Sequence, residues 1–274
     1  MLASPWRAPS VAVRRMRSPS PVRDDLRWAL DPVSFAVEAL RIVPDPWQEA
    51  VLRSSSRRLL LNCSRQAGKS TIASVLALHR ALFHANSLVL LLSPSLRQSS
   101  ELFRKVLDRL ACLPNAPDRR EDNRLSLTIA NGSRIVSLPS SEATVRGFSG
   151  VSLIIEDEAA FVPDDLYVAV RPMLAVSRGR LVLMSTPNGR RGHFFCSWSS
   201  PEETWERVRI TAREVPRISP EFLDEERRSL GDWRFRQEYE GVFAEGDDQV
   251  FRYDDVIAAL DGDVQPLFAG AAHG

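Results

Sequence analysis

Residues 63–71 read Cys-Ser-Arg-Gln-Ala-Gly-Lys-Ser-Thr, and they lie between a short apolar run at 59–62 and a stretch whose apolar residues recur every three or four positions up to Phe83. The apolar run predicts a buried strand, and the periodic stretch predicts a helix. A Gly-Lys-Ser sequence between a strand and a helix is typical of the Walker A loop, which binds phosphate. These nine residues therefore predict a P-loop fold.

The chemistry of phosphate binding explains these residue types. Backbone N–H groups at a helix N-terminus wrap a phosphate, a lysine adds positive charge, and a hydroxyl binds Mg²⁺. Lys69 and Ser70 would fill the last two roles. The usual first glycine is Cys63 here, so a plain turn with a surface lysine remains the alternative for the loop taken alone. Lys69 is, however, one of only two lysines among 36 basic residues, which favours a specific role.

A second motif is an apolar run that ends in acids, Leu153–Glu158. Such a run predicts a Walker B strand, in which Asp157 would hold Mg²⁺ and Glu158 would act as the general base on the attacking water. The alternative is an acidic loop that simply follows a buried strand. That alternative is weaker because the lysine of the first motif lies at the end of another predicted strand of the same sheet.

Two further segments complete the set. Ser185, Thr186 and Pro187 follow a third apolar run, where hydroxyl groups could sense the γ-phosphate, although a Pro-Asn-Gly turn explains the same residues. Gln48 lies just before the first strand and could pair with the edge of an adenine ring. A lone glutamine is more often exposed to solvent, so both readings stay open.

The order of elements predicts the fold class. Apolar runs at 59–62, 88–92, 151–155 and 181–184 alternate with helical patterns, and Asn131-Gly132 marks a hairpin. Strands that alternate with helices form a mainly parallel central sheet flanked by helices, with the chemistry at the carboxyl ends of the strands. We therefore expect an α/β P-loop NTPase of the RecA-like type, with further helices at 220–230 and 232–240.

Composition excludes several other classes of protein. The chain has 274 residues, of which 44% are hydrophobic and 26% charged, and this excludes disorder throughout. The longest aliphatic run has five residues, far below the ~20 that a membrane helix needs. Three cysteines without a CxxC pair and four scattered histidines do not suggest a metal site.

The two ends of the chain carry opposite charge. Residues 1–23 hold five arginines and no acid, whereas residues 246–274 hold six aspartates and one arginine. We expect a disordered basic arm at 1–28, a P-loop ATPase domain at 29–245 and an acidic tail or linker at 246–274. Met16 is an alternative start of the chain.

At this point the motifs resemble a known family, the large terminase subunit of tailed bacteriophages, over about residues 45–251. The resemblance rests on Pro46-Trp47-Gln48, on the 64–70 loop, on Arg146-Gly147, on 155–160, on 185–189, and on Gln237-Glu238-Tyr239 followed by Val250-Phe251. A Ser-Arg-Gln loop without the first glycine is itself typical of this family. The departure at residue 63 therefore supports the resemblance.

The resemblance implies a role for each matching residue. It implies an ATP site with Mg²⁺ held by Ser70 and Asp157, catalysis by Glu158 and Arg65, and coupling of hydrolysis to DNA movement through 185–187. Arg146 matches a position where some members place an arginine finger for a neighbouring subunit. The residues expected to contact ATP are Gln48, Ser64, Arg65, Gln66, Ala67, Gly68, Lys69, Ser70 and Thr71.

The resemblance also implies partners. These are double-stranded DNA bound without sequence specificity, a small terminase subunit, the portal or procapsid, and other copies of the chain in a ring, in the host cytoplasm and away from membranes. Candidate phosphate contacts are the arginine pairs at 57–58, 119–120, 190–191 and 227–228. Family members carry a C-terminal nuclease domain, and only 23 residues follow Phe251, so we expect this chain to lack it.

Two other interpretations stay open. The chain could be a prophage remnant that binds nucleotide or partners without turnover. It could also be a superfamily 2 helicase, because Asp157-Glu158-Ala159-Ala160 resembles a DEAD-like box. Helicases of that class need a second RecA-like domain, for which little chain is left.

Overall fold

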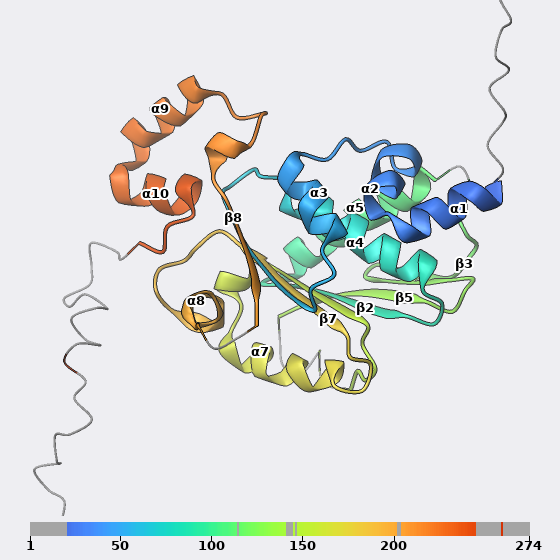
Figure 1. Ribbon diagram of the computed structural model, residues 1–274. Helices are drawn as coiled ribbons and strands as arrows, with labels where there is room; N and C mark the ends of the chain where they lie inside the picture. Colours follow the sequence, from blue (N-terminus) through green and yellow to red (C-terminus); the bar gives the residue numbers. More distant parts are fainter. Residues whose placement is uncertain are drawn as a thin grey trace, which may run out of the picture.

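A central sheet organises the protein. The computed structural model describes residues 21–113, 115–140, 145, 147–201, 204–244 and 259. The sheet has eight strands in the order β3-β4-β5-β2-β6-β7-β1-β8, and neighbours from β5 to β8 run parallel (Figure 1). The strands are β1 (Arg58–Cys63), β2 (Leu88–Ser93), β3 (Arg119–Asn123), β4 (Ser126–Ile129), β5 (Arg134–Pro139), β6 (Leu153–Asp157), β7 (Arg180–Ser185) and β8 (Glu206–Ile210).

The inner strands form because their sequences are apolar on both faces. Every residue of β6 is buried, and so are all but the first residues of β1, β2 and β7. Strands covered on both faces read as continuous apolar runs, which is why these four were predicted. The predicted hairpin is confirmed too, since β4 pairs antiparallel with β5.

Two edge strands were not predicted. β3 reads Arg-Arg-Glu-Asp-Asn and pairs antiparallel with β4, and β8 reads Glu-Arg-Val-Arg-Ile and pairs parallel with β1. Edge strands carry charges that prevent further pairing, and so they lack an apolar run. Only pairing with distant parts of the chain identifies them as strands.

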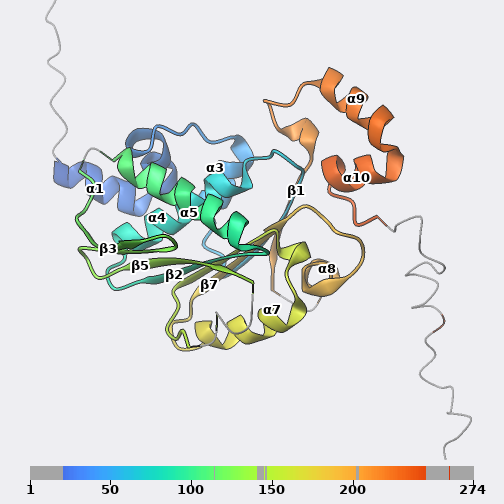
Figure 2. The same ribbon diagram turned by 180° about the vertical axis from the view of Figure 1, so that it is seen from behind.

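Helices cover both faces of the sheet (Figures 1 and 2). One face is covered by helices that pack around Leu59, Leu61, Val89 and Leu91, and the other by helices that pack around Leu60, Leu90 and their neighbours. The first group contains α1 (Pro21–Leu30), α2 (Pro32–Ser34), the π-helical turn η1 (Phe35–Ala39), α3 (Pro46–Arg53), α4 (Lys69–Phe83) and α5 (Leu96–Ala111). The second contains η2 (Ala159–Phe161), α7 (Asp164–Val170), η3 (Arg171–Leu174) and α8 (Gly192–Ser199).

A small helical unit follows β8. It consists of η4 (Ala212–Glu214), α9 (Pro220–Leu230) and α10 (Asp232–Glu240), and it stands beside one end of the sheet (Figure 1). Its own apolar cluster includes Leu223, Phe235 and Tyr239. The two main helices match the ranges predicted from sequence.

The predicted fold class is confirmed: the sheet is mainly parallel and flanked by helices. The helix α1 begins at Pro21, inside the stretch 1–28 that was expected to be a disordered arm. Residues 1–20 and almost all of 246–274 lie outside the described residues, and so do the expectations for them. No helix in the described part of the chain is both long and apolar enough to cross a membrane.

Candidate nucleotide site

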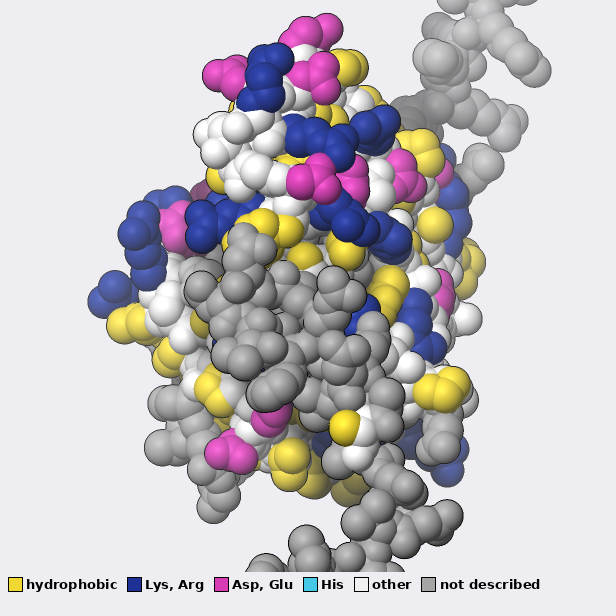
Figure 3. All heavy atoms as spheres, turned by 90° about the vertical axis from the view of Figure 1, so that its left-hand side faces the viewer, with side chains coloured by type: hydrophobic (Ala, Val, Ile, Leu, Met, Phe, Trp, Pro, Cys, Tyr) yellow, Lys and Arg dark blue, Asp and Glu magenta, His cyan; other side chains and the backbone are white. Residues whose placement is uncertain are grey.

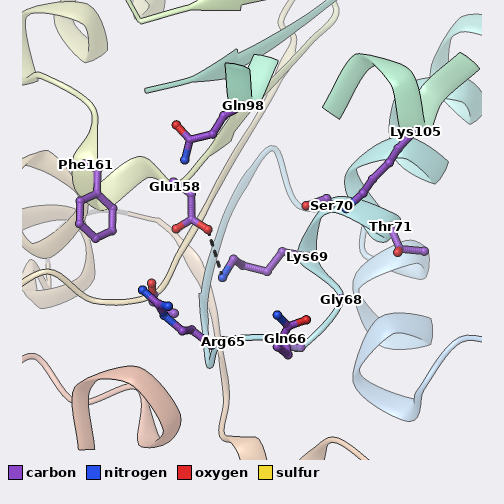
Figure 4. Close-up of a pocket in the computed structure, with 12 residues that line it drawn as sticks. Arg65, Gln66, Gly68, Lys69, Ser70, Thr71, Gln98, Lys105, Glu158 and Phe161 are labelled. Carbon is purple, nitrogen blue, oxygen red and sulfur yellow. Dashed lines mark ion pairs between the residues drawn. The ribbon is translucent and has the colours of Figure 1, made fainter. Parts of the chain in front are cut away.

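A cavity of about 480 Å³ opens at the carboxyl ends of β1, β2, β6 and β7 (Figure 4). Ligands of open α/β sheets bind at this edge, where the strand order reverses. The lining residues come from the 65–71 segment, from α5, from η2 and the residue before it, and from the residue after β7: Arg65, Gln66, Ala67, Gly68, Lys69, Ser70, Thr71, Gln98, Lys105, Glu158, Phe161 and Thr186.

The loop between β1 and α4 has the backbone that a phosphate-binding turn requires. Gln66 and Gly68 have positive φ angles of 60° and 96°, and α4 begins at Lys69 immediately afterwards. The φ of Gly68 favours glycine, and a Cβ at this position would lie 2.7 Å from Nε2 of Gln48 and would displace that amide group. Because Gly68 has no side chain, it does not cover the backbone N–H groups at the start of α4.

Cys63 replaces the usual first glycine at the end of β1. It is fully buried, and burial raises the pKa of its thiol to about 12, with Lys69 partly opposing the shift. The thiol is therefore neutral at physiological pH. Cys63 acts as a small apolar residue beneath the loop.

The two predicted motifs meet across the cavity. Lys69 Nζ lies 3.6 Å from Glu158 Oε1, as the dashed line in Figure 4 shows. Ser185 Oγ donates to Glu158 Oε2 at 3.3 Å. The segment 185–187, the third predicted motif, therefore also contacts the Glu158 carboxylate. Glu158 has a φ of 52°, a conformation that non-glycine residues rarely adopt and that clusters at functional sites.

Asp157, the last residue of β6, is suited to hold a cation. Burial raises the pKa of this carboxyl to about 6, the charge of Glu158 adds to the rise, and Lys69 partly offsets it. A buried carboxylate with a raised pKa is stabilised in its charged form when a cation binds. Ser70 lines the cavity at the start of α4. One hydroxyl and one carboxylate suit Mg²⁺, which keeps several waters and takes the rest of its ligands from phosphates.

Gln48 lies behind the loop and not in the cavity. Its Oε1 accepts from the N–H of Asp45 at 2.9 Å, and its Nε2 donates to the carbonyl oxygen of Ala67 at 3.3 Å. Arg217 supports the same carbonyl at 3.3 Å and pairs with Asp45 at 2.9 Å. Both ends of the Gln48 amide are therefore engaged by the protein.

The helix α10 contacts two of the predicted motifs. Arg65 Nε pairs with the carboxylate of Glu238, and the N–H of Arg65 donates to the carbonyl oxygen of the same residue at 2.9 Å. The N–H of Gly189 donates to Oε1 of Gln237 at 3.1 Å. The small helical unit is thus bonded to the loop after β1 and to the segment after β7.

Sequence reasoning missed three lining residues, Gln98, Lys105 and Phe161. Lys105 comes from the middle of α5, and Figure 4 shows it reaching towards Ser70. The available signal was composition, because the chain has only two lysines and both line this cavity. Arg146 lies outside the described residues.

The parallel sheet with this loop at its carboxyl edge defines the chain as an α/β P-loop NTPase. Residues 60–256 match the family described as "Terminase large subunit, T4likevirus-type, N-terminal". The chain therefore belongs to this family of large terminase subunits.

Individual relatives agree with the family match. The chain is 26% identical to the large terminase subunit of Thermus phage G20c over 84% of its own length, and 27% identical to that of Escherichia phage T5 over 86%. The large terminase ATPase domain of Thermus phage P74-26 superposes with a TM-score of 0.69 at 25% identity, over 78% of this chain and 100% of that one. The matches span 55% and 56% of the two curated relatives' lengths.

Proposed function

We propose that the chain is a Mg²⁺-dependent ATPase that drives packaging of double-stranded DNA. The observation that carries the proposal is the 3.6 Å approach of Lys69 and Glu158 across a cavity of about 480 Å³. A lysine at the start of the loop helix and a glutamate at the end of another parallel strand are two of the groups that P-loop NTPases use to hydrolyse ATP. The similarity to a solved terminase ATPase domain supports the same reading.

Each residue has a part in the proposed reaction. Lys69 and the N–H groups at the start of α4 bind the β- and γ-phosphates, and Lys105 adds a second positive charge from α5. Glu158 orients the attacking water and takes its proton. Bound through Ser70 and Asp157, Mg²⁺ would neutralise charge on the phosphate oxygens.

Lys69 and Glu158 pair directly in this structure. Phosphate oxygens compete for Lys69, so ATP binding would release Glu158 to act as a base. Ser185 Oγ keeps the other carboxylate oxygen in place during this change. Glu158 thus stays paired with Lys69, and does not act as a base, until ATP binds.

Arg65 and the 185–187 segment connect the site to α10. Arg65, which is expected to contact ATP, lines the cavity and is paired through Nε with Glu238 of α10. Thr186 lines the cavity, and Gly189, three residues later, is bonded to Gln237. We infer that a change in the bound nucleotide moves α10 through two contacts, that of Arg65 with Glu238 and that of Gly189 with Gln237. Gln48 would use its remaining Nε2 N–H for the adenine ring, because its other N–H donates to the Ala67 carbonyl.

DNA, the small subunit, the portal or procapsid and a ring of copies remain the proposed partners, with Arg146 as the proposed finger between copies. Figure 3 shows basic and acidic side chains mixed over the face that carries α9 and α10. On that helical unit Arg227, a predicted phosphate contact, pairs with Asp232. Acidic side chains lie among the basic ones on the described part of this face, and so the proposed DNA path is not assigned to α9.

Phosphate release by the purified chain, with and without duplex DNA, tests the proposal. Lys69→Ala and Glu158→Gln should each lower the turnover of ATP by about 10²-fold or more. The urea midpoint of each variant should change no more than that of a variant with a substitution at an exposed site. Glu101→Gln on α5 is the matched control, because this side chain is exposed and lies outside the cavity. Turnover retained in either variant contradicts the site, and nucleotide binding without any turnover in the unmodified chain favours the remnant interpretation.

A further inference from the structure

A second cavity, of about 490 Å³, lies at the opposite edge of the sheet. It is lined at the amino ends of β6 and β7 by Ser152 and Arg180, and at the C-terminal end of α4 by Arg80 and His84. The connection between α1 and α2 and the residues after α3 line its other side. The carbonyl oxygen of Trp28 in α1 is hydrogen-bonded to Nε2 of His79 in α4, and the ribbon views show α1 beside α4 (Figures 1 and 2). No part of the nucleotide site reaches it.

Two arginines in this cavity have buried N–H groups without a partner. Nε of Arg80, and Nε and Nη2 of Arg180, are shielded from solvent and make no hydrogen bond within the described part of the chain. The other guanidinium nitrogens, Nη1 and Nη2 of Arg80 and Nη1 of Arg180, are less shielded and make no hydrogen bond there either, so they are the ones that can reach a ligand in the cavity. Neither guanidinium forms an ion pair there. Burial lowers the pKa of both groups, which is the direction expected when a charge is desolvated without compensation.

The nearby acids are engaged elsewhere. Burial raises the pKa of Asp31, but hydrogen bonds from Ser34 Oγ, from Arg53 Nε at 3.2 Å and from two backbone N–H groups of α2 outweigh burial and lower it. Glu206 acts on Arg180 through its charge only, and its carboxylate accepts from Ser54 Oγ at 2.5 Å. The two free guanidinium groups therefore leave the cavity with excess positive charge.

The two histidines do not add to this charge. Burial lowers the pKa of His84, and the charge of Arg80 lowers it further. His79 is shifted in the same direction, again first by burial. At neutral pH both rings are uncharged, and so the excess charge belongs to the arginines alone.

Unpaired buried charge destabilises a fold, and most buried arginines are paired for that reason. Natural proteins keep such costly groups where a ligand needs them. We propose that this cavity is a second anion site, in which Arg80 and Arg180 bind a phosphate group. Its volume falls in the range of about 300–1,000 Å³ that is usual for small-molecule sites.

The site lies at the far end of the helix that begins with Lys69. Arg80 is eleven residues further along α4, or about 16 Å along the helix axis. A phosphate bound here would contact the same rigid helix as one bound in the first cavity. The proposal does not depend on the proposed ATPase, because it concerns only whether an anion binds.

Inorganic pyrophosphate, titrated by calorimetry at low salt into the Lys69→Ala protein, tests the proposal with the first phosphate site disabled. We expect one binding event, weakened at least tenfold when Arg80→Gln or Arg180→Gln is added. Arg104→Gln is the matched control, since this exposed arginine on α5 lies outside the cavity. Absence of binding to the Lys69→Ala protein, or binding that neither substitution weakens, overturns the proposal.

A stability measurement separates ligand binding from a structural role. Because the guanidinium groups are unpaired, Arg180→Gln should leave the urea midpoint of the free protein unchanged or raise it. A lowered midpoint together with lost binding assigns the arginine to the fold and overturns the proposal. Competition with a short DNA duplex identifies the source of the phosphate: displacement of pyrophosphate supports a DNA backbone phosphate, and its absence supports a free or nucleotide phosphate.

Discussion

The replacement His193→Leu should remove a buried ion pair that joins α8 to β6. His193 Nε2 lies 2.7 Å from Glu156 Oε1, and the two side chains are 4% and 0% exposed. Nδ1 lies 3.1 Å from Asp164, and the ring stacks on Tyr167 with centroids 4.6 Å apart. The second oxygen of Glu156 has no partner, so the histidine is its main compensation in the described structure.

Removing one member of a buried pair costs about 3–5 kcal/mol, because the other charge stays buried and uncompensated. We expect a loss of that size in the free energy of unfolding of His193→Leu, measured by urea unfolding at pH 6. Replacing both members by apolar residues is often neutral. The double variant Glu156→Leu/His193→Leu should therefore be more stable than His193→Leu alone.

The effect should also depend on pH. Burial alone would lower the pKa of His193, but Glu156 and Asp164 outweigh burial and raise it. The folded state then holds the proton more tightly than the unfolded state. This stabilisation is complete below the usual value of about 6.5 and is lost as the pH rises through the raised value. The difference between the two proteins should therefore shrink from pH 6 to pH 9.

Two results would refute this reasoning. One is a loss below about 1 kcal/mol for His193→Leu at pH 6. The other is a double variant as unstable as the single one. His84→Gln is the matched control, because burial lowers the pKa of His84, and so the stability of the unmodified protein relative to this variant should rise, not fall, from pH 6 to pH 9.

Three further predictions follow from the nucleotide site and the loop. Lys105→Ala should weaken ATP binding by roughly 10- to 100-fold, because a hydrogen bond to a charged group contributes about 1.5–3 kcal/mol. Unchanged affinity for ATP would place Lys105 outside the phosphate site. Gly68→Ala, at a φ of 96°, should lower the free energy of unfolding by about 1–3 kcal/mol, and an unchanged urea midpoint would contradict that strain. A thiol reagent at pH 8 should modify the exposed Cys112 and Cys196 in the folded protein but spare Cys63, as peptide mapping would reveal.

Much of the fold could be predicted because its signals are local. The runs at 59–62 and 181–184 are apolar on both faces, as inner parallel strands must be. The strand β8 could not be predicted, because Glu206–Ile210 has the charges of an edge and becomes a strand only by pairing with β1. β3 was not predicted for the same reason, because its sequence is also charged.

The site divides in the same way. Lys69, Glu158 and Ser185 were predicted, and the structure brings all three together, because each ends or follows an apolar strand of one sheet. Lys105 lies within a helix whose pattern indicates only amphipathic packing. Its place in the cavity depends on how α5 crosses the sheet, which the pattern does not specify.

The sequence by itself determined the phosphate-binding loop, the order of inner strands along the chain and the edge of the sheet at which the chemistry lies. These follow from side-chain types over short distances. Only the tertiary structure decided that α10 binds the loop through Glu238, that Gln48 lies behind it and that Arg80 and Arg180 share a cavity. Arg65 and Glu238 are 173 residues apart, and contacts over such separations arise from the packing of whole elements.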